Sequence, residues 1–577
     1  MTCNGADMKT TTIKFFSLFF LVKVLLVPLV LLWAPRAGFT AENYLAQSGP
    51  QISIEKFFPV RTVIKPDTEI PFSAVLKNTG DAAADLRNTL LLPDKATLLS
   101  GPLPNEHLQI PPEKTATLHW TITFHGVGDY DLHLTVFSGS SSIEKTLDVH
   151  VTDKYWRQGE FLLSAYNPPY AWHGAPYMDS VFDYYKNAHF DNLLWVRDDD
   201  ALVRQVHQHG FKYFLDVAGL IGEDELRGSA DGAPPVITDD KMQQLDAAIE
   251  KFKSDPDLLG YYICDEPFPS AFHNIARVVQ RIREKDPERL SFVNIWPYFE
   301  NEIGDDDYIE DFLQTTKVEL LSYDRYNFFN GYDENDAYFA QLERIRRQAL
   351  KYDIPFCNIV QAVGTNGTSV GTPGQGDEYL DWRTPNRAEH RWLVYSSLVY
   401  GVHGIIWFHW DHEWGVTGNP DRDIIYPSLQ SINAEIASLK EIMLHLTTTR
   451  VYHTDQTHNS ALWAASHYIT APGSAPLVVG FFKDESGHEK YFMVMNKNYS
   501  DDITEEISMN VPLAALRTFN VVRNQWEEVP VTQKTAGATF TVHLRKGGGK
   551  LFTFRQKKMP KTGNSIVPEI SPLLFSR

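Results

Sequence analysis

The sequence contains few cysteines, which limits what can hold the fold together. Only three occur among 577 residues, and Cys3 precedes the long apolar stretch near the start of the chain. Cys264 and Cys357 remain, so a disulfide framework is excluded and we expect two buried, unpaired thiols. No cysteine stands where an export signal would be cut, so a lipid-anchored form is not expected.

Positive charge is also scarce. The chain has 53 lysine and arginine residues against 73 aspartate and glutamate residues, and its formal net charge is −20. This excess would repel phosphate backbones, so no nucleic-acid partner is expected. No His-Glu-x-x-His spacing occurs, so neither a metal site nor a cofactor is predicted. Ser164 and Ser322 lack the strand-to-helix setting of a serine hydrolase, which disfavours an esterase or deacetylase.

Only one segment is apolar over a length that could cross a membrane. It runs from Phe15 to Trp33, and Lys23 and Pro28 interrupt it. These interruptions favour an export signal over residues 1–41, and an uncleaved anchor is the alternative. We therefore expect a periplasmic, secreted or cell-surface protein with no further membrane span.

The remaining chain is long enough for two to four domains. Alternating strand-like segments, separated by Gly, Pro, Asn and Asp, predict a β-sandwich over residues 45–153 and a second over 451–556. The first contains an "NTG" run that resembles immunoglobulin-like modules. The tail, 557–577, has no period, and we expect it to be loosely ordered.

Between the sandwiches, residues 155–447 alternate short apolar runs with helical patterns. Eight runs read as strands: 160–166, 191–196, 211–219, 258–264, 290–296, 318–324, 354–361 and 403–410. Eight such repeats over this length predict a (β/α)8 barrel. A doubly wound open sheet is the alternative, but it usually has a Gly-rich first loop, which is missing here.

Polar and aromatic side chains follow these strands, where a barrel forms its active site. The carboxyl pair Asp265 and Glu266 follows the fourth strand, and Asp324 ends the sixth. We predict these three as catalytic. Aromatic, amide and acidic residues at the other strand ends suit polyhydroxylated ligands. The candidates for substrate binding are Tyr166, Trp172, Trp296, Tyr323, Gln361, Trp407, Trp410 and Asp411.

The run "ICDEPFPS" invites two interpretations. Pro267 disfavours helical torsions at Glu266, so we expect Glu266 to be extended at the end of the strand. Glycosidic cleavage needs a carboxylic acid whose pKa is raised by apolar surroundings or by a nearby acid, and Asp265 supplies such an acid. The alternative is that "DEP" is simply a turn that starts a helix.

Four motifs, "GYYICDEP", "LLSYDRY", "IPFCNIVQAVG" and "LVYGVHGIIWFHW", occur in this order. Together they resemble the secreted (β/α)8-barrel glycoside hydrolase superfamily, in particular barrels whose fourth strand ends in Asp-Glu-Pro. The resemblance covers about 160–444 and, in outline, the C-terminal sandwich. It implies an exported glycosidase that acts on an oligosaccharide or polysaccharide, with Glu266 as general acid/base.

The same resemblance leaves the second catalytic group open. Retaining relatives carry a nucleophilic Glu after the seventh strand, where this chain has Gln361, which puts the usual double displacement in doubt. In barrels that act on N-acetyl sugars, an Asp-Glu pair orients the substrate's acetamide, as Asp265 and Glu266 could with Tyr323 assisting. If a protein nucleophile or base exists, Asp324 and Asp411 are the candidates, then Glu413. The alternative function is a non-catalytic barrel that kept an aromatic carbohydrate-binding cleft.

Overall fold

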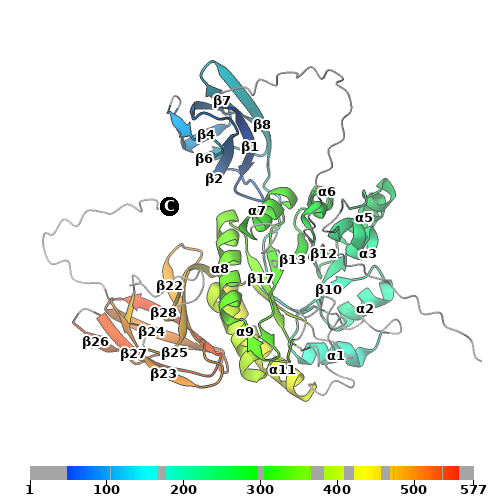
Figure 1. Ribbon diagram of the computed structural model, residues 1–577. Helices are drawn as coiled ribbons and strands as arrows, with labels where there is room; N and C mark the ends of the chain where they lie inside the picture. Colours follow the sequence, from blue (N-terminus) through cyan, green and yellow to red (C-terminus); the bar gives the residue numbers. More distant parts are fainter. Residues whose placement is uncertain are drawn as a thin grey trace, which may run out of the picture.

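The computed structural model shows three parts that follow one another along the chain (Figure 1). It describes residues 49–103, 106–166, 168, 177–229, 232, 234–296, 305–362, 364, 382–408, 422–455, 468–471, 474–535 and 537–557.

The N-terminal part is a sandwich of two antiparallel sheets, drawn in blue and cyan in Figure 1. One sheet has the order β1-β2-β6-β4 and the other β5-β3-β7-β8. Burial alternates along β3 because successive side chains of a strand point to opposite faces. The inward sets of both sheets pack around Phe72, Trp120 and Leu134. The strands are β1 Ile52–Pro59, β2 Ile70–Asn78, β3 Ala84–Leu91, β4 Ala96–Ser100, β5 Leu108–Ile110, β6 Thr115–Phe124, β7 Gly128–Ser138 and β8 Ser141–Val151.

The central part is a closed barrel of eight parallel strands. Pairing of Trp407 in β18 with Ala165 in β9 joins the last strand to the first. The predicted fold class, a (β/α)8 barrel between two β-sandwiches, is therefore confirmed. The barrel strands are β9 Leu162–Ala165, β10 Asn192–Val196, β11 Lys212–Asp216, β12 Leu258–Asp265, β13 Leu290–Ile295, β14 Leu321–Asp324, β17 Phe356–Gln361 and β18 Gly404–Phe408.

Amphipathic helices cover the outside of the barrel. In α6 the buried residues recur three and four positions apart, as in Ile275, Val278 and Ile282, so that one face meets the strands. A short ribbon, β15 Phe328–Phe329 with β16 Tyr332–Asp333, follows β14. The helices are α1 Asp179–Asn187, α2 Asp200–Gln208, α3 Ala218–Ile221, α4 Glu223–Arg227, α5 Asp239–Phe252, the 3-10 turn Pro269–Ala271, α6 Phe272–Lys285, α7 Asp305–Thr316, α8 Asn335–Tyr352, α9 Arg387–Tyr400 and α11 Arg422–Leu444.

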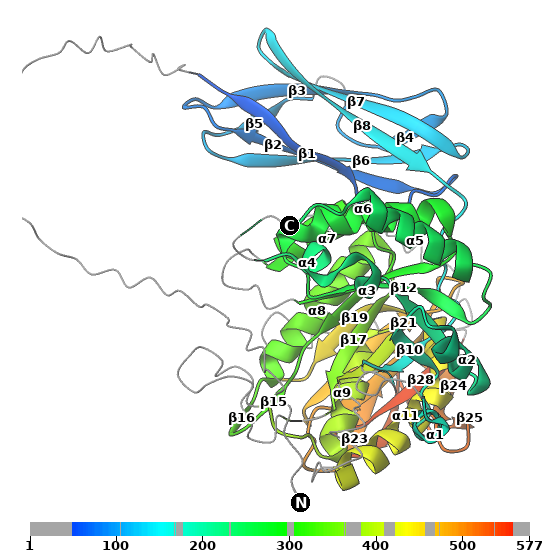
Figure 2. The ribbon, with the colours of Figure 1, turned by 90° about the vertical axis from the view of Figure 1, so that its right-hand side faces the viewer.

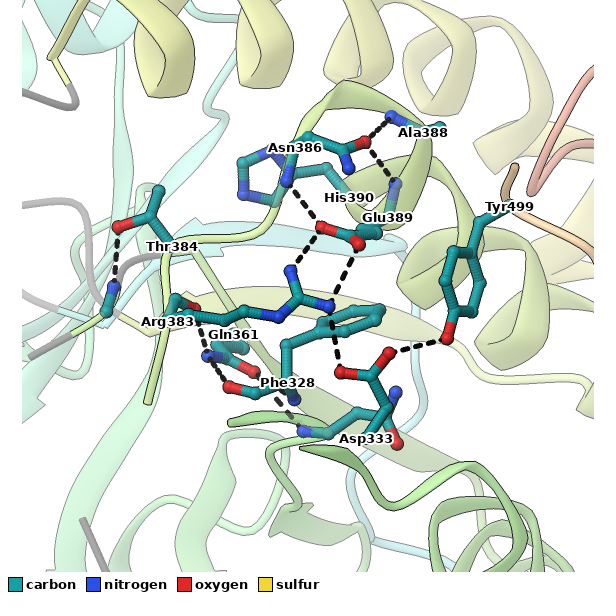
Figure 3. Close-up of polar contacts among 12 residues, drawn as sticks. Phe328, Asp333, Gln361, Arg383, Thr384, Asn386, Ala388, Glu389, His390 and Tyr499 are labelled. Atoms are coloured by element: carbon teal, nitrogen blue, oxygen red, sulfur yellow. Dashed lines mark hydrogen bonds and ion pairs between the residues drawn. The ribbon is translucent and has the colours of Figure 1, made fainter. Parts of the chain in front are cut away.

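Local sequence sets where these helices begin. The Asn386 side chain accepts hydrogen bonds from the backbone N–H groups of Ala388 and Glu389, and Glu389 bonds back to the Asn386 N–H, forming a capping box (Figure 3). Helix α5 is capped by Thr238, whose side chain accepts from the Lys241 N–H at 3.4 Å, and not by Asp239 or Asp240. The two aspartates instead occupy the first turn, where the helix dipole favours negative charge.

Side chains inside the barrel are distinct from those facing the helices. The interior cluster includes Leu194, Phe214, Phe292, Ile359 and Ile406, and Trp156 packs against it. The outward set joins the helices in the main hydrophobic core. Because only alternate residues face inward, this division decides which strand-end residues can reach a ligand.

The C-terminal sandwich packs directly against the barrel through α9. Val478 and Phe482 join the barrel's hydrophobic core. Gly480 is required there, because a Cβ atom would lie 2.1 Å from the Val399 carbonyl oxygen of α9. The strands are β19 Thr447–His453, β20 Ile469–Ala471, β21 Leu477–Lys483, β22 Glu489–Asn496, β23 Ile503–Met509, β24 Leu513–Asn520, β25 Gln525–Glu528, β26 Thr532–Lys534, β27 Gly537–Leu544 and β28 Gly549–Gln556.

The N-terminal sandwich lies over α6 and α7, as Figure 2 shows. The Lys56 ammonium of β1 pairs with Asp311 of α7 at 2.5 Å. Arg61 donates to the Lys351 carbonyl oxygen at 2.9 Å, which ties the sandwich to α8. Exposed ion pairs contribute little stability, so these contacts orient the sandwich more than they hold it.

The thiols of Cys264 and Cys357 are both free and buried, as predicted. Cys357 belongs to the barrel interior, whereas Cys264 faces the helical layer and donates to the Leu226 carbonyl oxygen at 3.2 Å. Within the described ranges, no helix combines the length and hydropathy that a membrane crossing requires.

Candidate active site

A β-bulge in β12 turns Asp265 into the barrel. Tyr262 pairs with Phe292 of β13, but the next pair is Cys264 with Val293, so Ile263 is an extra residue. The insertion reverses the alternation, and Asp265 then pairs with Asn294. Without the bulge, Cys264 would point inward with Tyr262, and Asp265 would face the helices. Bulges commonly re-aim a side chain in this way beside active sites.

The amide of Asn294 bridges two carboxyl groups. Its Nδ2 donates to Asp265 Oδ1 at 3.0 Å and to Asp324 Oδ1 at 2.9 Å. The Ser322 hydroxyl donates to Asn294 Oδ1 at 3.0 Å, which fixes the orientation of the amide. Since both carboxylate oxygens bond to one nitrogen, they lie no more than about 6 Å apart. The fourth, fifth and sixth strands therefore present one assembled polar cluster.

Burial dominates the protonation of the two aspartates. It raises the pKa of Asp265, while hydrogen bonds from Tyr166 and Asn294 oppose the rise. Burial and then the charge of Asp265 raise the pKa of Asp324 to about 7. The Tyr166 hydroxyl bonds to Asp265 and lies 2.9 Å from the Tyr262 hydroxyl. When Tyr166 donates its one proton to an ionised Asp265, it accepts from Tyr262.

Glu266 lies beside this pair in an unusual backbone conformation. Its φ is +48°, so the predicted extended conformation is wrong. Its N–H donates to the Asn294 carbonyl oxygen at 2.9 Å, extending the parallel ladder one residue past the strand, and Pro267 then ends the pairing. A positive φ at a residue other than glycine is uncommon and concentrates at functional sites.

The surroundings of Glu266 favour its protonated form. Burial, followed by the charges of Asp324 and Asp265, raises its pKa to about 9, although Arg227 opposes this. Arg227 Nη2 lies 3.1 Å from Glu266 Oε2, and the Glu266 side chain is 23% exposed. This carboxyl group is thus partly accessible and protonated at neutral pH.

Sequence interpretation missed two residues that support this turn. Arg227 ends α4 and approaches Glu266 from the neighbouring βα connection. The hydroxyl of buried Tyr308 on α7 donates to the Pro267 carbonyl oxygen at 2.8 Å. No local sequence pattern marks either residue, because both are far from the turn in sequence and approach it only in the folded barrel.

An aromatic series lines part of the same end of the barrel. Phe408 lies 5.5 Å from Tyr166 and 5.1 Å from Tyr326 between ring centroids, and Trp382 lies 4.6 Å from Tyr326. Trp195 contacts Tyr166 at 6.4 Å and donates its indole N–H to the Tyr166 carbonyl oxygen. Tyr166 therefore lies at the same end of the barrel as the carboxyl cluster, and its contact with substrate stays a prediction.

Gln361 serves the protein's own backbone. Its Oε1 accepts from the N–H groups of Asn327 and Phe328, and its Nε2 donates to the carbonyl oxygens of Phe328 and Arg383 (Figure 3). The side chain is fully buried. Its predicted contact with substrate is contradicted, because its hydrogen-bonding groups are already occupied by the segments around Phe328 and Arg383.

Two further predicted contacts point away from the barrel interior. Trp407 is fully buried against α11 and donates its indole N–H to Asn433 Oδ1 at 2.8 Å. Tyr323 is fully buried in the core between barrel and helices, so it cannot assist Asp265 as suggested. Both lie at outward positions of their strands, whereas their neighbours Phe408 and Asp324 face inward.

The other predicted site residues divide into two groups. Trp296 directly follows β13 and is half-buried. Trp172, Trp410 and Asp411 lie outside the described residues, as does Glu413. The segment Gly367–Gly371 reads GTSVG, a Gly-x-Ser-x-Gly spacing that the sequence interpretation overlooked, and it also lies outside them.

Among the described residues, the side chains arranged closely enough to share a metal ion are His207, Asp255 and Asp257. They lie at the opposite end of β12 from Asp265, where β12 begins. Asp255 already accepts from the Tyr213 hydroxyl at 2.7 Å and contacts His207 at 2.9 Å. This group is therefore not part of the carboxyl cluster.

Comparison with known proteins finds similarity to solved structures at low sequence identity. No family model and no curated protein matches the chain. Among solved structures, a Paenibacillus cycloisomaltooligosaccharide glucanotransferase complexed with cycloisomaltoheptaose is similar at 9% identity, covering 86% of this chain and 99% of that one, with a TM-score of 0.43. A GH2 β-galacturonidase from Eisenbergiella tayi matches at 10% identity over 66% and 72%, with a TM-score of 0.32. A Bacteroides uniformis β-glucuronidase matches at 11% identity over 86% and 60%, with a TM-score of 0.30. Identities this low do not assign an activity to this chain.

Proposed function

We propose that this protein is a glycoside hydrolase in which Glu266 acts as the general acid/base. The observation that carries the proposal is the Glu266 carboxyl group at the open end of a barrel, with a pKa of about 9 beside two further carboxyl groups. Three carboxyl groups this close together in a buried site do not all ionise together. At neutral pH Glu266 keeps its proton and can donate it to a glycosidic oxygen.

The partner carboxylate comes from the pair bridged by Asn294. Asp324 is the stronger electrostatic neighbour of Glu266, and its own pKa of about 7 leaves it substantially ionised at neutral pH. We assign Asp324 as nucleophile or base. Asp265, which accepts from Tyr166 and Asn294, fits either a supporting role or the orientation of a substrate acetamide.

The open end of the barrel also suits a sugar ring. Phe408 and Trp382 are half-buried at this end of the barrel, where they can offer apolar surface, and Tyr326 packs between them. The oxygen atoms of a pyranose can bond to the acid and amide groups nearby. The ligand class we assign is an oligosaccharide or polysaccharide.

One observation favours a second function, a non-catalytic carbohydrate-binding barrel. Retaining barrels of the resembled superfamily have a nucleophilic Glu where this chain has Gln361, and here that residue holds loops together. Under this alternative the acid cluster would bind sugar hydroxyls without cleaving a bond.

Purified protein and three variants, tested on a panel of aryl and natural glycosides, would separate these functions. Glu266→Gln keeps the shape and removes the acid, so it should lower turnover of natural glycosides by about 10²–10⁴-fold. Activated aryl glycosides need less protonation and should be affected less. Asp324→Asn should abolish turnover of both classes. No turnover of any glycoside by the parent protein, with sugar binding intact, would establish the non-catalytic function.

The Asp265→Asn variant decides the role of the third carboxyl group. A loss of turnover confined to N-acetyl substrates, activated ones included, would indicate acetamide assistance. A stability change with turnover nearly unaltered would make Asp265 a positioning residue.

We further propose that the chain is exported, on the basis of the apolar run Phe15–Trp33 and the resemblance to secreted enzymes. Expression in a bacterial host, followed by mass spectrometry of the fractionated protein, tests this proposal. A cytoplasmic chain that begins at its first methionine would contradict it.

A further inference from the structure

A cavity lies between the outer helices of the barrel and the C-terminal sandwich, and none of the carboxyl-cluster residues line it. Its volume is about 710 Å³, within the range of ligand sites. One wall comes from α9 and α11, and the other from β24, β27 and β28. Figure 1 shows this sandwich, drawn in orange and red, beside α9 and α11.

Four basic residues and three acidic ones line this cavity, namely Arg391, Arg523, Arg545 and Lys550 with Glu435, Asp502 and Glu527. Arg523 pairs with Glu527 at 3.0 Å, which leaves three basic side chains beside Glu435 and Asp502. Arg391 is buried, and its Nε atom lacks a hydrogen bond. Its nearest acidic atom is Glu435 Oε1 at 3.7 Å, and Arg545 Nη1 lies at the same distance from that oxygen. Two guanidinium groups thus share one loosely placed carboxylate, whose other oxygen accepts from the Tyr395 hydroxyl at 2.8 Å.

Lys550 adds a further positive charge to the same wall. It is half-buried and, among the described residues, has no hydrogen bond or ion pair. Burial and the nearby Arg545 lower its pKa, and the weaker opposing effect of Glu527 does not offset them. A buried or half-buried cation is usually paired, so a missing anion is the simplest physical account of this arrangement.

The walls of the cavity are rigid. A Cβ atom at Gly549 would lie 2.7 Å from the Tyr395 ring, and one at Gly548 would lie 3.0 Å from Arg391 Cδ, so β28 begins in direct contact with α9. The Arg545 carbonyl oxygen accepts from the Gly548 N–H at 2.9 Å, which fixes the turn that carries these groups. The backbone that carries Arg545 and Lys550 is therefore held against α9, and this lowers part of the entropic cost of binding.

We propose that this cavity binds a short acidic oligosaccharide, through carboxylate or sulfate groups that contact Arg391, Arg545 and Lys550. Arginine favours planar oxyanions because its N–H donors match their geometry. Thr504, Thr518 and Asn520 also line the cavity, and each of these side chains bonds to a neighbouring residue of the sandwich. The net charge of −20 would repel a long polyanion such as a nucleic acid, whereas a short ligand can enter one positive cavity.

The test is calorimetric titration of the full chain at low salt with trigalacturonate, a sulfated disaccharide and neutral maltotriose. The matched variants are Arg545→Gln with Lys550→Gln, both at partly exposed side chains, and the control Arg517→Gln. Arg517 lies on β24, is 53% exposed and pairs with Glu528. Thermal unfolding of each variant checks that the fold is retained.

We expect at least one acidic probe to bind the parent and the control alike, with an affinity that falls as salt rises. The double variant should bind it at least about tenfold more weakly, the equivalent of one lost charge-assisted contact. Hydrogen-exchange protection should appear in residues 545–551 and 391–395. Binding that the double variant retains, binding of no acidic probe, equal binding of maltotriose, protection confined to the barrel mouth, or tighter binding of a single-stranded DNA oligomer would each overturn the proposal.

Discussion

Glu266 should make the protein less stable as pH rises, because the folded state disfavours its ionisation. The pKa rises from an ordinary 4.5 to about 9 in the fold. Below pH 4.5 the folded and unfolded states are both protonated, so the group has no effect. Between these values the unfolded chain releases a proton that the folded chain retains, so each rise in pH favours unfolding. Above about pH 9 both states are ionised, and the penalty stays constant.

The loss in the free energy of unfolding is set by the pH interval over which only the unfolded chain is ionised. From 4.5 to neutral pH the shift corresponds to about 3 kcal/mol at 1.36 kcal/mol per pH unit. Because the side chain is 23% exposed and next to Arg227, solvent and the guanidinium reduce this to about 1–2 kcal/mol. Glu266→Gln removes the ionisable group. It should therefore raise the melting temperature at pH 7 by about 2–8 °C relative to the parent, although it removes the proposed acid.

Scanning calorimetry of parent and variant at pH 5, 7 and 8.5 measures the difference directly. The stabilisation should be near zero at pH 5 and grow steadily to pH 8.5. Glu284→Gln is the matched control, because Glu284 is 50% exposed on α6, and its effect should stay within about 0.5 kcal/mol at every pH. A Glu266→Gln difference that does not change between pH 5 and 8.5 would refute the raised pKa and with it the reason for choosing Glu266 as acid.

Three further outcomes follow from the structure. Asn294→Ala removes the donor shared by two carboxylates, so the pKa of the pair should rise and the acidic limb of any pH–rate profile should move to higher pH; an unchanged limb would show that the bridge does not act on the site. Gly480→Ala forces a Cβ atom against the Val399 carbonyl oxygen, and it should destabilise the docking of the C-terminal sandwich by about 1–3 kcal/mol, measured by calorimetry and by faster proteolysis of that sandwich. Cys264 and Cys357 should not react with a thiol reagent in the folded mature chain and should both react after denaturation, whereas a mass change on reduction would reveal a bond between them.

Local sequence patterns predict much of the architecture. Apolar runs of four to eight residues alternate with amphipathic helices, and this repeat alone predicts the eight strands of the barrel. Runs of alternating burial flanked by turn residues likewise predict both sandwiches. Helix ends such as the Asn386 cap and Gly401, whose φ of 88° suits glycine, depend on neighbouring residues and are readable for the same reason.

The sequence predicts only part of the candidate site. The sequence places Asp265, Glu266 and Asp324 after their strands, and the barrel's closure brings them to one end. Which side chains face inward depends on strand register, and the bulge at Ile263 changes that register where no composition signal marks it. This is why Asp265 enters the cluster.

Trp407, Tyr323 and Gln361 are predicted substrate contacts that the structure does not support. All three lie at the last or second-last position of their strands and are residue types that bind sugars, yet two face the helices and the third bonds to loop backbone. The sequence determined which residues end each strand, since hydrophobic periodicity and turn chemistry are local. Only the tertiary structure decided which of them meet, because pairing register, the positive φ of Glu266 and the approach of Arg227 and Tyr308 arise from contacts between segments far apart in the chain.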